Sequence, residues 1–250
     1  MATPTQGWCR EIQSEQWTDD REVDILGAYL DGTLTATEAA EGLTNYVDKR
    51  KTSETKVGRI WTLLQVCAVE CADLHEQLID LIKAMTACAP SKRTGGVDWT
   101  KQETSFKETW RESYDSLSTS LQDKIEYQRA SNVPIAQRWT NYHAFSAQLA
   151  TYAFFGNDFD VVSGLLVIVA ALEKESPTSK IICRDGQSMG AGCDLRSEKW
   201  VGKAGFSQKR WKFWKDRLEE LQKSDAIGEK VRQLLRTATV AMGKAERAKK

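Results

Sequence analysis

The chain has 250 residues, of which 41% are hydrophobic, so it can bury one sizeable core and is near the upper size limit for a single domain. Thirty-five basic residues balance thirty-five acidic ones, which gives no long-range attraction for polyanions. We therefore expect no nucleic-acid partner, and the basic tail at Lys244, Arg247, Lys249 and Lys250 is typical of a solvated helix end.

The first residues lack the basic patch and apolar core of a secretory signal or membrane anchor. The most apolar run, 164–172, is far shorter than the roughly 20 residues that a membrane-spanning helix needs. Six scattered cysteines fit free thiols in a reducing compartment. These features predict a cytoplasmic protein without a membrane span.

Helical signals follow one another from the start of the chain. Thr18 and the acidic residues after it predict a helix that Asp31-Gly32 ends. Thr35 and Glu38 form a capping box that begins a second helix, to about Lys49. Apolar positions from about Ser53 to Ala89 keep a helical period, which predicts one long or bent helix.

After a loop at 90–96, Thr100 and Glu103 suggest another capping box. The following helix carries one apolar stripe, at Phe106, Trp110, Tyr114, Leu117, Leu121 and Ile125. Pro134 is placed to open a helix that runs to about Phe155. Residues 159–173 are apolar on every side, which predicts a central helix surrounded by others.

Residues 176–206 carry five glycines and no helical period, which predicts a functional or mobile loop. Ser207 caps a helix to about Lys223, and Ser224 starts the last one. The fold prediction is an all-α, single-domain bundle over 1–250, with about eight or nine helices around the central apolar helix.

Two clusters of potential metal ligands are better explained without a metal. Cys67 and His75 are eight residues apart, a rise of roughly 12 Å along one helix, which is too far for a shared zinc. Asp20 and Asp24 project away from the apolar stripe of their helix and should face water.

A third cluster, Asn157, Asp158 and Asp160, precedes the central apolar segment. Carboxylates there could hold Mg²⁺ facing a cavity, although Asn and Asp are also common helix caps. Both interpretations stay open.

Arg138 projects among the apolar residues of its helix, beside Tyr142 and Phe145. A charge in that position needs a partner, which is either a buried carboxylate or a phosphate group held by the guanidinium fork. His143, at the margin of the same stripe, is best explained as a structural histidine whose hydrogen bonds are satisfied.

The helix after Ser207 has an aromatic stripe with Trp211 and Trp214, flanked by Arg210 and Lys215. The two cations either border the apolar face with their charged ends in water or hold an anion beside an aromatic wall. The chain contains no dinucleotide-binding motif, no P-loop and no nucleophile elbow.

Three blocks carry a family resemblance: LDGTLTATEAA at 30–40, RWTNYHAF at 138–145 running on to Leu172 and Glu173, and GFSQKRWKFWK at 205–215. Together they resemble a large family of all-helical proteins of filamentous ascomycetes whose function is mostly unassigned. The resemblance covers most of the chain and implies a small-molecule role in secondary metabolism.

A second resemblance is to non-canonical fungal humulene synthases, helical enzymes that hold farnesyl diphosphate with magnesium and a lysine on a late helix. Lys215 is the position here that could match that lysine.

The function prediction is therefore a non-canonical sesquiterpene cyclase that ionises an isoprenyl diphosphate with Mg²⁺. Lys215 and Arg138 would be catalytic, and the substrate would be bound by Arg210, Trp139, Tyr142, Trp211 and Trp214. The alternative is a non-enzymatic helical protein that binds an apolar small molecule or another protein.

Overall fold

Every regular element that the structure describes is a helix. The computed structural model describes residues 4–48, 53–89, 96–123, 131–150, 152, 172, 199, 201, 207–224 and 228–248. Within them lie nine α-helices and two 3₁₀ helices, with no strand, which confirms the all-α class.

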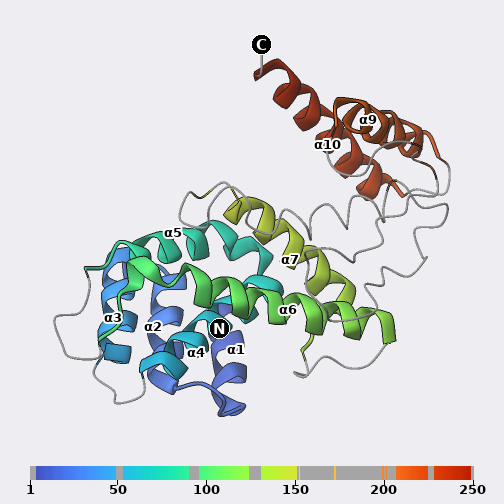
Figure 1. Ribbon diagram of the computed structural model, residues 1–250. Coiled ribbons are helices and arrows are strands. Elements are labelled where there is room, and N and C mark those ends of the chain that lie inside the picture. The colour runs from blue at the N-terminus through green and yellow to red at the C-terminus, as the bar shows by residue number, and fades with distance from the viewer. Residues whose placement is uncertain are drawn as a thin grey trace. The chain divides into compact units, whose positions relative to one another are not determined.

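Contacts divide the chain into two compact units, Met1–Val161 and Val162–Lys250. A single domain over 1–250 stays a prediction. The first unit contains α1 (Pro4–Ser14), α2 (Asp20–Leu30), α3 (Ala36–Asp48), α4 (Ser53–Glu70), η1 (Ala72–Leu74), α5 (His75–Thr86), η2 (Trp99–Lys101), α6 (Glu103–Asp123) and α7 (Ile135–Leu149) (Figure 1). The second contains α9 (Gln208–Gln222) and α10 (Glu229–Ala248).

Local capping predicted some helix starts and missed others. The Thr35 amide donates to Glu38 Oε2 over 2.8 Å and the Glu38 amide donates to Thr35 Oγ1 over 3.3 Å, so the predicted capping box is confirmed. Ser207 caps α9 as predicted, by accepting from the Arg210 amide. At α2 the cap is Asp19 rather than Thr18.

The Thr100 hydroxyl donates to Asp98 Oδ1 over 2.6 Å and Glu103 is itself the first residue of α6, so the predicted Thr100–Glu103 capping box is wrong. The last helix begins at Glu229 rather than at Ser224.

The segment 53–89, predicted to be one long or bent helix, bends and is divided into two α-helices. Cys71 leaves the helical conformation, with φ −124° and ψ 70°, and η1 separates α4 from α5. His75 Nε2 donates to the Ala68 carbonyl over 2.8 Å, which satisfies an acceptor near the end of α4. Because the chain bends between Cys67 and His75, a straight-helix distance no longer describes their separation.

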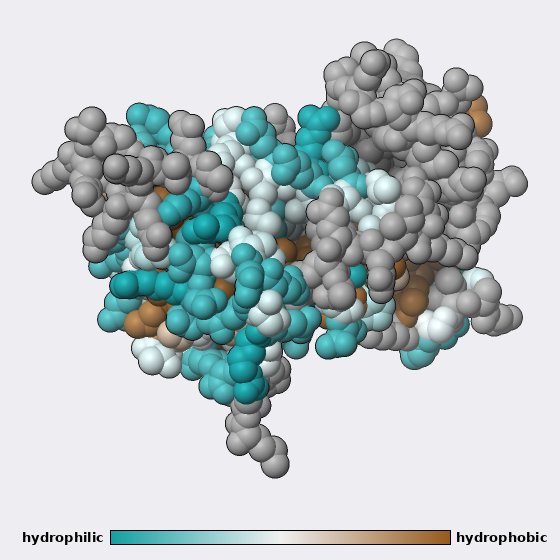
Figure 2. Space-filling view, turned by 90° about the horizontal axis from the view of Figure 1, so that it is seen from below, coloured by the Kyte–Doolittle hydropathy of each residue, from teal (hydrophilic) through white to brown (hydrophobic). Residues whose placement is uncertain are grey.

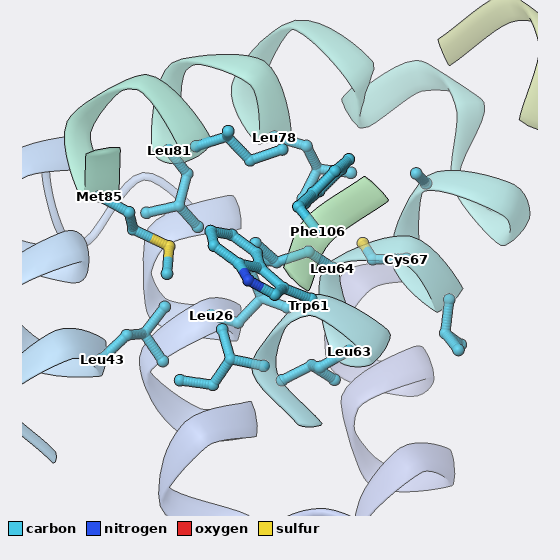
Figure 3. Packing of buried hydrophobic residues seen from close by; sticks show 14 of the residues in the cluster. Leu26, Leu43, Trp61, Leu63, Leu64, Cys67, Leu78, Leu81, Met85 and Phe106 are labelled. Atoms are coloured by element: carbon cyan, nitrogen blue, oxygen red, sulfur yellow. The ribbon is translucent and has the colours of Figure 1, made fainter. Parts of the chain in front are cut away.

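Trp61 on α4 lies at the centre of the core of the first unit and is fully buried (Figure 3). Its ring meets Trp99 and Phe106 edge-on, with centroids 5.6 and 5.2 Å away. Aliphatic side chains from α2, α3, α4 and α5 surround it, among them Leu26, Leu43, Leu64, Leu78, Leu81 and Met85. The Trp61 side chain therefore packs against side chains from four helices of the first unit.

A buried ion pair joins α2 to α4. Glu22 is completely buried, and Arg59 donates to both of its carboxylate oxygens, over 2.9 and 2.6 Å. Thr18 donates to the same carboxylate over 3.1 Å. The charge is therefore desolvated but fully hydrogen-bonded.

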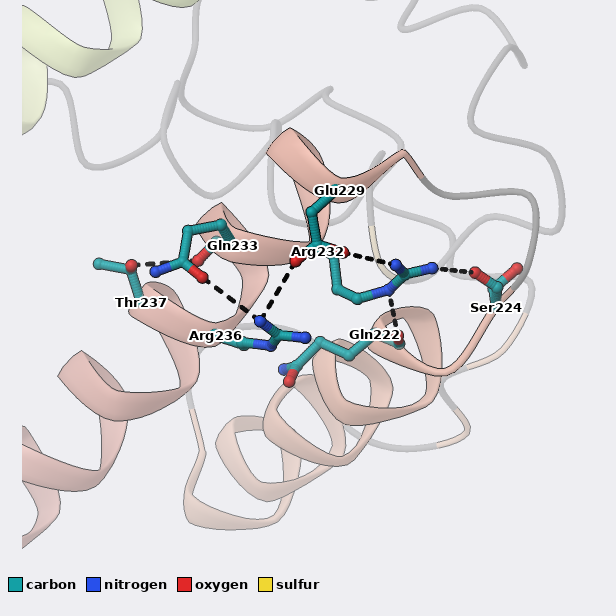
Figure 4. A network of polar contacts seen from close by, with 7 residues as sticks. All are labelled: Gln222, Ser224, Glu229, Arg232, Gln233, Arg236 and Thr237. Atoms are coloured by element: carbon teal, nitrogen blue, oxygen red, sulfur yellow. Dashed lines mark hydrogen bonds and ion pairs between the residues drawn. The ribbon is translucent and has the colours of Figure 1, made fainter.

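In the second unit α9 and α10 form a helical hairpin, with Trp214 and Leu218 buried against apolar side chains of α10. Arg232 at the start of α10 donates to the carbonyl oxygens of Gln222 and Ser224, over 2.9 and 3.3 Å (Figure 4). It also donates to Glu229 over 2.7 Å. A cation thus neutralises the carbonyl end of α9, where the helix dipole is negative.

No helix among the described residues is long and apolar enough to cross a membrane. The described residues on the face shown in Figure 2 are mostly hydrophilic, with small separate hydrophobic areas between them. Large exposed hydrophobic side chains in the described part are Val201, Val231 and Val240, all in the second unit.

Replacing Arg59 with Met should lower the free energy of unfolding by about 3 kcal/mol, because it leaves the Glu22 carboxylate buried without its cation. The double variant Glu22→Leu/Arg59→Met should recover most of that loss. Urea unfolding of the wild type, both single variants and the double variant measures the coupling. Additive effects of the two single changes would contradict this account.

Candidate functional site

The α7 helix carries three of the predicted site residues and begins where the sequence indicates. Pro134 is the residue before the first turn, with φ −55° and ψ 143°, and its carbonyl accepts from the amides of Gln137 and Arg138. The helix ends at Leu149 rather than near Phe155. Arg138, Tyr142 and Phe145 lie on its buried face, as the helical period predicts.

Four rings from α6 and α7 form an aromatic ladder: Phe106, Trp110, Tyr142 and Trp139. Successive centroids are 5.9, 4.3 and 6.4 Å apart, and the planes of neighbouring rings differ by 14–15°. Phe106, Trp110 and Tyr142 are almost completely buried, and Trp139 is half-buried. Rings this close leave no space between them for a ligand.

The polar side-chain atoms of Trp110 and Tyr142 are bonded inside the protein. Trp110 Nε1 donates to Ser146 Oγ over 2.8 Å, and the Tyr142 hydroxyl donates to the Trp110 carbonyl over 3.1 Å. Asn141 on the same helix donates to the Val69 carbonyl of α4 over 2.9 Å. These bonds fix α7 against α6 and α4. The same donors are therefore not available to bind a ligand.

Arg138 is only 5% exposed and lies 4.0 Å from Glu70. The other oxygen of that carboxylate accepts from Trp8 Nε1 over 2.9 Å. The arrangement links α1, α4 and α7 through one buried charge pair. Of the two partners considered for Arg138 from the sequence, a carboxylate is the one that the described residues provide.

His143 lies among the rings of Tyr114, Trp139 and Tyr142, at centroid distances of 6.1, 4.4 and 5.2 Å. Its Nε2 is buried without a hydrogen bond. Burial lowers the pKa of His143 to about 4, so the ring is neutral at physiological pH. The buried Nε2 without a hydrogen bond contradicts the expectation of a satisfied structural histidine.

In the second unit the cations of α9 have different environments. Arg210 is 1% exposed, and its guanidinium carbon is 5.5 Å from the centroid of the Trp214 ring. Lys215 pairs with Glu246 of α10 over 2.8 Å, and Trp211 Nε1 donates to the same carboxylate over 3.1 Å. Arg210 is therefore buried rather than extended into water, whereas Lys215 takes part in a surface ion pair.

The proposed magnesium ligands Asn157, Asp158 and Asp160 lie outside the described residues, as does the loop at 176–206 apart from Lys199 and Val201. Only Leu172 of the predicted central helix is described. Within the described ranges, no group of three or more His, Cys, Asp or Glu side chains could hold a metal ion.

Within the described residues, Cys9, Cys67, Cys71 and Cys88 form no disulfide. Burial, with smaller contributions from nearby acidic groups, raises the pKa of Cys9 to about 11. A side-chain hydrogen bond with Cys71, together with burial, also raises the pKa of Cys67. Thiols that stay protonated at neutral pH are poor nucleophiles, which favours a packing role for Cys9 and Cys67.

The sequence did not indicate a groove between α5 and α7 with a volume of about 570 Å³. Glu76, Asp80 and Lys83 line it from α5, and Tyr152 follows α7. Thr86 and Tyr152 share a hydrogen bond of 2.8 Å between their hydroxyls. The spacing of Glu76 and Asp80 places both carboxylates on one face of α5, but the sequence does not show that Tyr152 lies opposite them. The volume of the groove suits a small ligand.

Comparison with known proteins finds one family. Residues 61–218, from α4 to α9, match the family described as "Protein of unknown function (DUF3632)". The chain belongs to this family. The aromatic ladder, Arg138 and Arg210 all lie within the segment that matches the family. No curated protein and no solved structure matches the chain.

The pH dependence of stability tests the buried state of His143. Because its pKa falls from 6.5 to about 4 on folding, its contribution is present above pH 6.5 and is lost as the pH falls toward 4. His143→Phe should reduce the loss of unfolding free energy between pH 7.5 and 4.5 by on the order of 1–3 kcal/mol. Equal pH slopes for wild type and variant in urea unfolding would contradict the assignment.

Proposed function

We propose that the protein is a non-enzymatic helical binding module. The observation that carries this proposal is the aromatic ladder, since Tyr142 is stacked between Trp110 and Trp139 at centroid distances of 4.3 and 6.4 Å. An aromatic pocket for a flexible isoprenyl chain requires ring faces that line an open cavity. Here ring faces cover one another and stabilise the pairing of α6 with α7.

The environment of Arg138 supports the same proposal. Its side chain is 6% exposed and Glu70, 3% exposed, lies within ion-pair distance. A carboxylate at this distance makes no hydrogen bond to the guanidinium, but its charge weakens the attraction of Arg138 for a diphosphate. Arg138 is thus better suited to joining α7 to α4 than to binding substrate.

Binding is supported by the α5–α7 groove, which lies on the surface of the first unit. Ile79 and Ala147 supply apolar contact, and Glu76, Asp80 and Lys83 supply charged groups. A mixed lining of this kind suits a small amphipathic molecule or a peptide side chain. This groove is our candidate for the ligand site of the module.

A terpene cyclase is the second candidate, and the burial of Arg210 against Trp214 favours it. A desolvated cation beside an indole ring is the combination that would hold a diphosphate next to an aromatic wall. Lys215 follows on the same helix, at the position that could match the late-helix lysine of the humulene synthases.

Magnesium would neutralise the diphosphate leaving group in such an enzyme. The residues predicted to bind it, Asn157, Asp158 and Asp160, are outside the described part, so the proposal is limited to the cations and rings of α9.

One assay separates the two candidates. Purified protein is incubated with farnesyl and geranylgeranyl diphosphates, with and without Mg²⁺, and extracts are analysed for hydrocarbons and terpene alcohols. The binding-module proposal expects no metal-dependent product. Arg138→Met should in addition lower the free energy of unfolding by about 3 kcal/mol, because it leaves Glu70 buried without its cation.

The opposite pattern would overturn the proposal. It consists of a metal-dependent product that is lost in Arg210→Met and Lys215→Met while circular dichroism shows intact folding. An Arg138→Met variant of unchanged or increased stability would indicate a ligand-binding arginine, since such residues are commonly retained at a cost in stability.

A further inference from the structure

The zero net charge of the chain conceals an uneven distribution between its two units. Residues 1–161 contain 16 Lys or Arg and 24 Asp or Glu, whereas residues 162–250 contain 19 and 11. The first unit is therefore acidic and the second is basic. This difference makes the second unit a candidate surface for an anionic partner, independently of either function considered above.

The antiparallel α9–α10 hairpin fixes which residues share an end. Lys215 and Trp211 both contact Glu246, so the first half of α9 lies beside the last turns of α10. Gln222 bonds to Thr239 over 2.9 Å, toward the other end. We call residues 208–216 with 243–248 the open end of the hairpin, and residues 217–242 the loop end.

The basic residues are concentrated at the open end. It contains six cations and two anions, Lys209, Arg210, Lys212, Lys215, Lys244 and Arg247 against Asp216 and Glu246. The loop end contains five cations and four anions, so it is nearly neutral. At the loop end Arg232 and Arg236 both pair with Glu229 (Figure 4).

Several cations of the open end are available for binding. Lys209, Lys244 and Arg247 are exposed, and none of them pairs with an acidic side chain of the described residues at ion-pair distance. The Lys212 side chain is 76% exposed and makes only an exposed pair with Asp216, which contributes little. Four long basic side chains thus extend from one tip of the hairpin.

We propose that the open end of the α9–α10 hairpin binds an anionic phospholipid surface. Clusters of four to eight Lys or Arg residues on helices are attracted to phosphatidylserine-rich membranes, with an energy that adds up over the cations near the surface. If the hairpin contacts a membrane through its open end, many lipid phosphates lie close to these cations, whereas the nearly neutral loop end stays away from the surface.

Other anions fit the open end less well. A small phosphate ligand is normally held in a concave site, whereas these side chains are exposed. Nucleic acid presents a line of phosphates and is bound by cations that extend along a helix or groove, whereas here they are confined to one tip. The charge distribution therefore favours a planar anionic surface.

Vesicle sedimentation with the full chain tests the proposal. Phosphatidylcholine vesicles with and without about 30% phosphatidylserine are compared at about 50 and 500 mM salt, because screening weakens surface electrostatics. Binding should require phosphatidylserine and fall at high salt. Lys209→Gln/Arg247→Gln at the open end should weaken the partition coefficient roughly tenfold, and Lys244→Gln/Arg247→Gln should act similarly.

The matched control is Lys223→Gln/Arg236→Gln at the loop end, which removes the same total charge. It should weaken vesicle binding less than about threefold, since these residues lie away from the tip. The proposal is overturned if both ends have equal effects, if vesicles without phosphatidylserine bind equally well, or if a DNA duplex at matched phosphate concentration binds more tightly. Circular dichroism checks that each variant is folded.

Discussion

The stacking of Tyr142 between Trp110 and Trp139 is the interaction on which the first unit depends most. It packs α7 against α6, and its hydroxyl bonds to the backbone of Trp110, so apolar and polar constraints fix the same ring. Tyr142, which the sequence predicts as a substrate-binding residue, packs against the neighbouring rings of Trp110 and Trp139. The aromatic side chains of α6 and α7 therefore pack the two helices together and do not line a pocket between them.

Charge is used in three different ways. Buried pairs such as Glu22 with Arg59 connect helices and require both partners, because one charge left alone in the core is strongly unfavourable. Arg232 instead neutralises the carbonyl end of a helix. Lys209 and Lys212 at the open end of the hairpin have neither role, since they are exposed and lie at the start of α9, and this is why we assign the open end to a partner rather than to the fold.

The sequence predicted features that depend on a few neighbouring residues and missed those that depend on distant ones. The Thr35 capping box and the buried face of α7 follow from local spacing, and both are correct. The break at Cys71 was missed because α4 and α5 bury their apolar residues in the same core, which preserves a helical period across the bend. Helical projection placed Arg138 on an apolar face, but its partner Glu70 is 68 positions earlier and no spacing rule identifies it.

Hydrogen exchange of the Trp110 indole N–H, followed by NMR, tests the central claim most directly. Its donor is bonded to the buried Ser146 hydroxyl over 2.8 Å, at the centre of the aromatic ladder. We predict exchange only through global opening, with a free energy within about 1 kcal/mol of that for complete unfolding. Exchange through a much smaller opening, unaffected by denaturant, would show that solvent reaches the rings and that the centre of the unit is hollow.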